Sequence, residues 1–185
     1  MFLSKRLIAK SVIAGALIAA LGTGTAFAQS YPNKTITLVA PYAVGGDSDF
    51  SGRNLSVVAS KLIGQSVIVT NIVGASGTIG SQRVRTAAPD GYTLLVSRGG
   101  SQAITPALDS STPYKWNDFT FISLLDFNPV VCVVKPDAPY KTMKDLIDAI
   151  RANPGKLNYA TAGPGTTQHL AVEVILSQLG LPSTA

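Results

Sequence analysis

The sequence of 185 residues contains one cysteine, one histidine and one tryptophan, and only 14% of its residues are charged. A single cysteine can form neither an internal disulfide nor a cysteine cluster for a metal ion. Cys132 lies inside the apolar run 130–134, which favours a small hydrophobic residue buried in a core strand. No basic run is interleaved with aromatic residues, so the sequence has no signature of nucleic-acid binding.

The first 28 residues have the pattern of a secretory signal peptide. Lys5, Arg6 and Lys10 form a basic start, an apolar run covers 12–21, and Ala26-Phe27-Ala28 has small residues at the cleavage-site positions. This run is shorter than the about 20 apolar residues of a membrane-spanning helix, although an uncleaved anchor is the alternative. We expect cleavage after Ala28. The net charge of +5 then falls to +2, because the segment holds three basic residues and no acidic ones.

Apolar runs alternate with helical patterns along the rest of the chain, which predicts parallel βαβ units in an open α/β sheet. A looser stretch over 98–117 marks the predicted boundary between a first lobe of residues 29–103 and a second lobe of residues 104–185. The expected strands are 36–41, 67–69, 93–97, 119–125, 130–134 and 157–160. The first expected helix begins near 47–49 and stops at Gly64, and the second follows the glycine segment 74–80 and runs through about Ala87. The third is capped by Thr142 and ends at 153–155, and the last follows the glycine turn of 160–170 and ends at Gly180. Their expected buried faces are formed by Leu55, Val58, Ala59 and Leu62, by Met143, Leu146, Ile147 and Ile150, and by Val172, Ile175, Leu176 and Leu179. Arg53 is expected to pair with Asp49 four residues earlier, and Asp145 to complete a capping box with Thr142.

Two segments, 41–49 and 160–170, run from a predicted strand through a glycine turn into a predicted helix. Free backbone N–H groups at a helix start, together with the positive end of the helix dipole, attract an anion. The second segment also contains two threonine hydroxyls and the only histidine, His169. The two loops therefore predict a cleft that binds a small acidic molecule.

Other chemistry is weakly supported. Asp47 and Asp49 fit a helix cap better than a metal site, because further spaced oxygen ligands are lacking. The glycines of 74–80 do not follow the dinucleotide-binding pattern. His169 and Ser101 invite a catalytic interpretation, but no nucleophile, base and orienting group can be assembled around them. A secreted α/β hydrolase remains the less favoured enzymatic alternative.

Five motifs, taken together, resemble the extracytoplasmic solute receptors of tripartite tricarboxylate transporters, the Bug receptors. The motifs are Pro41-Tyr42-x-x-Gly45-Gly46-x-x-Asp49 with Arg53, Asn71 followed by Gly74-x-x-Gly77-x-Ile79-Gly80, Ala88-Pro89-Asp90-Gly91-Tyr92-Thr93-Leu94-Leu95, Asn153-Pro154-Gly155-Lys156-Leu157-Asn158-Tyr159, and Gly163-x-Gly165-Thr166-x-x-His169-Leu170. The likeness extends from Tyr31 to the last residues.

The resemblance implies a periplasmic binding protein of type II-like fold, with two α/β lobes around a cleft, and neither a cofactor nor a metal nor catalysis. It implies a small carboxylate as ligand and membrane transporter or sensor subunits as partners, with a monomer as the full-length form. Ligand contacts carried over from the family are Gly45, Gly46 and Asp49 in the first lobe and Gly165, Thr166 and His169 in the second. Thr167 is a further candidate ligand contact, because it supplies the second threonine hydroxyl of that loop. Ser76, Gly77, Ser101 and Gln102 are expected in the walls.

The chain departs from the family pattern in individual residues and in length. Ile72-Val73 precedes Gly74 where a proline-glycine pair is common, and Ser101-Gln102 replaces a common threonine-histidine pair. Arg98 adds a positive side chain near the expected cleft. Family members are also longer, which implies that the C-terminal part of the second lobe is missing, and a non-functional receptor remnant is therefore a further alternative.

Overall fold

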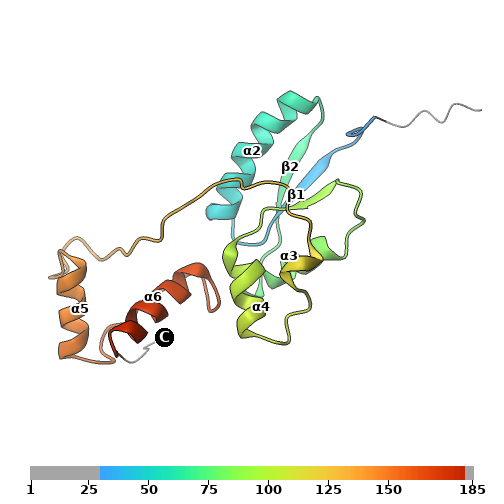
Figure 1. Ribbon diagram of the computed structural model, residues 1–185. Helices are drawn as coiled ribbons and strands as arrows, with labels where there is room; N and C mark the ends of the chain where they lie inside the picture. Colours follow the sequence, from blue (N-terminus) through green and yellow to red (C-terminus); the bar gives the residue numbers. More distant parts are fainter. Residues whose placement is uncertain (1–29, 182–185) are drawn as a thin grey trace, which may run out of the picture. The chain divides into compact units, whose positions relative to one another are not determined.

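The computed structural model describes residues 30–181 (Figure 1). The chain divides after Asn33, and every helix and strand named below belongs to the unit that begins at Lys34. Among the described helices, none is both long and apolar enough to cross a bilayer. The predicted signal peptide and its cleavage site lie outside the described residues.

Three parallel strands form the sheet, as the sequence predicted. They are β1 (Ile36–Ala40), β2 (Val67–Asn71) and β3 (Thr93–Leu95), in the order β2-β1-β3 (Figure 1). Leu38 of β1 pairs with Val69 on one side and Leu94 on the other, so β1 is central. Its apolar run fits a strand covered on both faces. The core consists of the buried residues Ile36, Leu38, Val67 and Val96, with Ala59, Val69, Tyr92 and Leu94 packed against them.

Helix α2 (Asp47–Ile63) ends as predicted at Gly64, whose φ of +67° is left-handed. Its predicted buried face is wrong in part, because Val58 and Leu62 are exposed and only Ala59 packs on the core. The helix approaches the sheet through small residues instead. A Cβ on Gly52 would lie 3.3 Å from Val96 and 3.4 Å from Val69, so the buried face is rotated toward Ser48, Ser51 and Gly52.

Short helical segments connect the sheet to the second part of the chain. The turn η1 (Ala75–Gly77) leads into α3 (Thr78–Arg85). After β3 come the π-helical turn η2 (Gly100–Ile104), helix α4 (Thr105–Leu108) and the turn η3 (Trp116–Asp118). Residues 98–117, predicted only as a loose region, therefore contain helical turns. The predicted lobe boundary itself stays a prediction.

Helices α5 (Met143–Ala152) and α6 (Thr167–Gln178) have the predicted ends. Thr142 Oγ1 accepts the N–H of Asp145 at 3.2 Å, and Asp145 Oδ2 accepts the N–H of Thr142 at 2.9 Å, which completes the expected capping box. Helix α6 is followed by Gly180, next to which the N–H of Leu181 donates to the carbonyl of Leu176 at 2.9 Å. This bond belongs to a Schellman motif, the usual glycine-terminated helix end.

The predicted strands 119–125, 130–134 and 157–160 are absent from the described structure, because no described segment pairs with them in a ladder. Because these segments have no partner strand, many of the apolar side chains in this part of the chain are exposed to solvent, and Phe127 is 88% exposed. The predicted burial of Cys132 is wrong for the same reason, since the free thiol is exposed. Helix α5 likewise has no fully buried residue and Met143 is exposed, while α6 buries only Leu176 and leaves Ile175 exposed.

Candidate ligand-binding site

Two loops of the chain have the same backbone geometry. In the first, the N–H of Gly46 donates to the carbonyl of Ala43 at 3.0 Å; in the second, the N–H of Thr166 donates to the carbonyl of Gly163 at 3.3 Å. The third residue of each turn has a positive φ, +77° at Gly45 and +76° at Gly165. This is the position at which a type II turn requires glycine. The predicted glycine turns at two helix starts are therefore present.

In each loop, the positive-φ glycine is held by the side chain four residues later. The N–H of Gly45 donates to Asp49 Oδ2 at 2.9 Å, and the N–H of Gly165 donates to His169 Nδ1 at 3.4 Å. His169 therefore accepts through an unprotonated Nδ1, and its Nε2 lies 3.8 Å from a carboxylate oxygen of Glu173. The histidine orients a loop, and it faces no nucleophile in these contacts.

Asp49 is a buried carboxylate whose charge is fully matched. Arg53 contacts both oxygens, with Nε at 3.0 Å from Oδ2 and Nη2 at 2.9 Å from Oδ1, which confirms the predicted pair. Hydrogen bonds from Arg53 and then from the Gly45 N–H lower the pKa of Asp49 to about 2. The N-cap of α2 is Gly46, so Asp49 steadies the helix start from inside the first turn. In the described part of the chain, no group of three or more acidic, histidine or cysteine side chains could hold a metal ion.

Helix starts α2 and α6 offer backbone donors to an anion. The first intrahelical bond of α2 begins at the Phe50 N–H, and Gly46 has no side chain to satisfy the amides before it. In α6, Thr166 Oγ1 accepts the N–H of His169 at 3.4 Å. The amides of the two preceding residues, Thr167 and Gln168, remain available as donors. Unpaired N–H groups at the positive end of a helix dipole bind carboxylates without a full positive charge.

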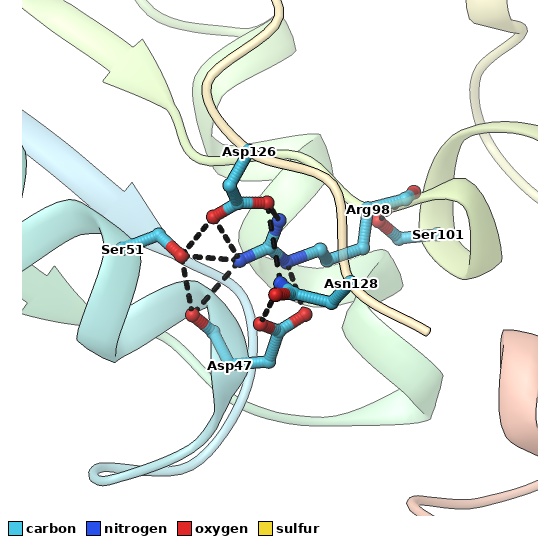
Figure 2. A network of polar contacts seen from close by, with 6 residues as sticks. All are labelled: Asp47, Ser51, Arg98, Ser101, Asp126 and Asn128. Carbon is cyan, nitrogen blue, oxygen red and sulfur yellow. Dashed lines mark hydrogen bonds and ion pairs between the residues drawn. The ribbon is translucent and has the colours of Figure 1, made fainter. Parts of the chain in front are cut away.

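Arg98 lies in a polar network beside the start of α2, shown in Figure 2. Its guanidinium contacts Asp126 Oδ1 at 2.5 Å, Asp47 Oδ2 at 2.8 Å and Ser51 Oγ at 2.8 Å. Asn128 donates to Asp47 Oδ1 at 2.7 Å. The hydrogen bond from Arg98 is the main cause that lowers the pKa of Asp126. Two carboxylates thus neutralise Arg98, which does not act as an uncommitted counter-charge for a ligand.

The four predicted wall residues lie in one region around Tyr42. Gly77 is buried there, and a Cβ on it would lie 2.9 Å from Ser101 Cβ and 3.0 Å from Tyr42. Ser101 donates to the carbonyl of Arg98 at 3.2 Å, and Gln102 Nε2 donates to Ser81 at 2.9 Å. These two side chains are engaged internally, and their role toward a ligand stays a prediction.

The second loop lies against the same region. Ser76 Oγ donates to the carbonyl of Pro164 at 2.5 Å, and Gly100 approaches the Cα of Thr166 so closely that a Cβ would lie 3.1 Å away. Thr166 is buried and donates to the carbonyl of Gly163 at 2.7 Å, while Thr167 is exposed. The structure therefore brings the predicted second-loop residues next to the predicted wall.

Three residues of this region were not among the predicted ligand contacts. Tyr42 donates to the carbonyl of Ser76 at 3.0 Å, and burial raises the pKa of its hydroxyl. Thr105 Oγ1 donates to the carbonyl of Gly165 at 3.4 Å. Ser48 is fully buried, and its Oγ has no partner in the described chain. In the sequence, Tyr42 and Ser48 flank the glycine pair, and Thr105 stands where the receptor family commonly has asparagine.

Residues 52–184 match the receptor family of tripartite tricarboxylate transporters. The chain belongs to this family. Among relatives, it is 38% identical to a UPF0065 protein of Cupriavidus necator over 96% of this chain and 55% of that protein. It is 33% identical to protein BugT of Bordetella pertussis over 83% of this chain and 48% of that protein. The chain thus spans about half the length of the relatives it matches.

Solved structures of similar proteins share the fold. MatC of Rhodopseudomonas palustris with bound malate aligns with a TM-score of 0.76 at 32% identity, over 83% of this chain and 53% of that one. An R. palustris protein with adipate aligns with a TM-score of 0.71 at 29% identity, over 84% of this chain and 52% of that protein. The periplasmic binding protein BugD aligns with a TM-score of 0.67 at 31% identity, over 82% of this chain and 51% of that protein. The predicted α/β fold of periplasmic binding proteins is confirmed.

Proposed function

We propose that this chain forms the anion-binding part of a periplasmic solute receptor. It captures a small carboxylate and presents it to membrane subunits of a tripartite transporter. The observation that carries the proposal is the pair of equivalent turns at the starts of α2 and α6, each leaving helix amides available to an anion. Membership of the receptor family and the similarity to MatC, which is solved with bound malate, support the same chemistry.

The proposed contacts are made mostly by the backbone. Gly45 and Gly46 in the first loop and Gly165 in the second allow the main chain to approach the ligand closely, because they lack a Cβ. Asp49 and His169 hold the turns in place, and Thr166 and Thr167 supply hydroxyls at the start of α6. Binding then depends on preorganised N–H donors more than on opposite charge, which suits a carboxylate flanked by Asp49.

Calorimetric titration of the purified full chain with malate and with adipate tests the proposal. We expect binding of at least one dicarboxylate and none of the corresponding neutral diamide, which has the same carbon skeleton without the charges. Thr166→Ala removes the cap of α6 and its hydroxyl, and should weaken binding by about 1–3 kcal/mol. The control Thr142→Ala removes the equivalent cap of α5 and should leave affinity unchanged. Equal heats for the acid and its diamide would contradict the proposal.

Export is proposed from the N-terminal pattern, with cleavage after Ala28. Periplasmic location is the condition in which a receptor of this family meets its transporter. Intact-mass measurement of the chain from the periplasmic fraction is expected to give a protein that begins at Gln29. Recovery of the uncleaved chain in the membrane fraction would favour the anchored alternative.

A further inference from the structure

The segment from Gly74 to Gly77 has four successive residues with positive φ: 131°, 45°, 52° and 92°. Two of them, Ala75 and Ser76, carry a Cβ, for which the left-handed conformation is unfavourable. Tyr42 supports the segment by donating to the carbonyl of Ser76 at 3.0 Å. A segment that keeps an unfavourable conformation in this way is expected to position a functional group for a specific contact.

The group placed by this segment is the hydroxyl of Ser76. It donates at 2.5 Å to the carbonyl of Pro164, the second residue of the turn that precedes α6. Gly163 is also near, because a Cβ built on it would lie 3.2 Å from Ser76 Oγ. The contact joins residues 88 positions apart in the sequence, so it fixes the second loop from outside that loop.

The carbonyl of Pro164 and the N–H of Gly165 belong to one peptide group. Ser76 holds the oxygen end of this group, and His169 Nδ1 accepts from the N–H end at 3.4 Å. The orientation of the central peptide is what distinguishes a type II turn from a type I turn, and only the former has a positive φ at the third residue. The φ of +76° at Gly165 shows the type II orientation.

Groups near His169 do not disturb this arrangement. Glu173 lies 3.8 Å from the opposite ring nitrogen, and Tyr159 donates to the same carboxylate at 2.6 Å. The turn η2, which packs against α6, consists of residues without titratable side chains. The first loop differs, since its peptide between Val44 and Gly45 is held at the N–H end by the charged Asp49.

We propose that Ser76 is a positioning residue for anion binding, which together with His169 grips the two ends of the Pro164–Gly165 peptide and prevents it from flipping. The grip keeps the start of α6 in the orientation that presents its amides to the ligand. This inference rests on the proposed function. It gives Ser76 a role on the second loop in place of a direct contact with the carboxylate.

Three substitutions in the full chain test whether Ser76 holds the Pro164–Gly165 peptide in place. Ser76→Gly accepts the left-handed conformation and removes the hydroxyl. Ser76→Asn also tolerates that conformation and restores a donor through its amide. Ala75→Gly is the matched control, because it relieves the neighbouring left-handed residue and leaves the hydroxyl in place. None of these changes introduces a side chain that the backbone would reject.

Amide hydrogen exchange, measured by NMR without ligand, reports on the peptide directly. In Ser76→Gly we expect exchange of the Gly165 amide to rise about threefold to tenfold, as for the loss of one hydrogen bond. Exchange at Gly45 should not change. Ser76→Asn should restore slow exchange, and Ala75→Gly should match the original chain. Unchanged exchange at Gly165 in Ser76→Gly, or equal acceleration at Gly45, would overturn the proposal.

Titration with malate supplies the second arm of the test. Ser76→Gly should weaken binding by the same about threefold to tenfold, and Ser76→Asn should recover it. If the exchange results are as expected but the original chain binds no dicarboxylate, the role of Ser76 in holding the Pro164–Gly165 peptide is supported and the proposed function is contradicted. If the original chain binds malate and Ser76→Gly binds it equally well, the positioning role falls and the function stands.

Discussion

Asp49 and His169 perform the same task in two loops with different chemistry. Each accepts the N–H of the glycine four residues earlier, but Asp49 does so at 2.9 Å as a charged group and His169 at 3.4 Å as a ring nitrogen. Hydrogen bonds to a charged acceptor are roughly twice as strong as neutral ones. The first loop is therefore held more firmly by its own helix, and the second depends on additional contacts.

This difference predicts unequal effects of removing the two side chains. Asp49→Ala should weaken malate binding by about tenfold or more, and His169→Ala by about threefold, because the lost bond is charged in one case and neutral in the other. Calorimetric titration of both variants beside the original chain gives the comparison. A larger loss for His169→Ala than for Asp49→Ala would contradict the ranking of the two loops.

Asp49 also predicts a component of acid stability. Its pKa falls from 3.8 to about 2 on folding, so it stabilises the folded chain above pH of about 4, and this contribution is lost as the pH falls toward 2. Asn at this position cannot ionise. Urea midpoints at pH 7, 4 and 2 should therefore decline more steeply for the original chain than for Asp49→Asn. The same dependence of the urea midpoint on pH in both proteins would show that Asp49 does not contribute to acid stability.

Single residues were predictable from the sequence where their partners are local. The pair Asp49–Arg53 follows from a spacing of four on a helix, and the capping box Thr142–Asp145 from a spacing of three. Arg98 was noted, but its partners Asp47 and Asp126 lie 51 and 28 residues away. Contacts across such separations depend on the fold, which no local spacing reveals.

At the scale of elements, close approach of α3 to the sheet depends on Gly80. A Cβ at this position would lie 2.5 Å from the carbonyl oxygen of Ile72 and 2.9 Å from Pro41, and both are backbone neighbours that cannot turn aside. The helix would gain intrinsic propensity from alanine, yet its packing distance would have to increase. The steric effect dominates because the clash is with backbone.

Gly80→Ala is therefore expected to lower the free energy of unfolding by about 1–3 kcal/mol, as other overpacked sites do. Gly52→Ala in α2 is the matched control, since its nearest neighbours are methyl groups of Val96 and Val69 at 3.3–3.4 Å that can shift. Urea unfolding followed by circular dichroism compares the two. An equal or smaller loss in Gly80→Ala would mean that α3 moves away from the sheet at little cost.

The strands β1, β2 and β3, the ends of α2, α5 and α6, and both glycine loops could be predicted because each has a local signal. The π-helical turn η2 could not, since Gly100–Ile104 contains no helix-start pattern and is shaped by contacts with Tyr42 and Thr166. The predicted strands beyond residue 118 have the right apolar pattern. Pairing decides whether such a segment becomes a strand, and composition does not supply a partner.

At the scale of the molecule, residues 121–134 leave apolar side chains in solvent. Leu124 is 83% exposed, Phe127 88% and Val133 84%. An extended apolar segment with unpaired backbone groups invites pairing with another chain. The relatives are about twice as long, so this chain represents only part of the surface that a full receptor of the family contains.

The exposed segment predicts self-association of the chain as given. Leu124→Lys combined with Phe127→Lys should shift the protein toward monomer, because two charges replace two of the three most exposed large apolar side chains of this segment. Leu108→Lys, at a 65% exposed position on α4, is the control for added charge. Sedimentation velocity at several concentrations measures the distribution. Indistinguishable distributions for the double variant and the control would contradict the assignment of this segment.

The central claim is that the helix starts of α2 and α6 together bind a carboxylate. The most direct test is an NMR titration of the ¹⁵N-labelled full chain with malate, with its neutral diamide as the control. We expect the largest amide shifts at Asp47, Ser48, Thr167 and Gln168, saturating together, and none with the diamide. Malate-induced shifts confined to other residues, or the same shifts with the diamide, would contradict the claim.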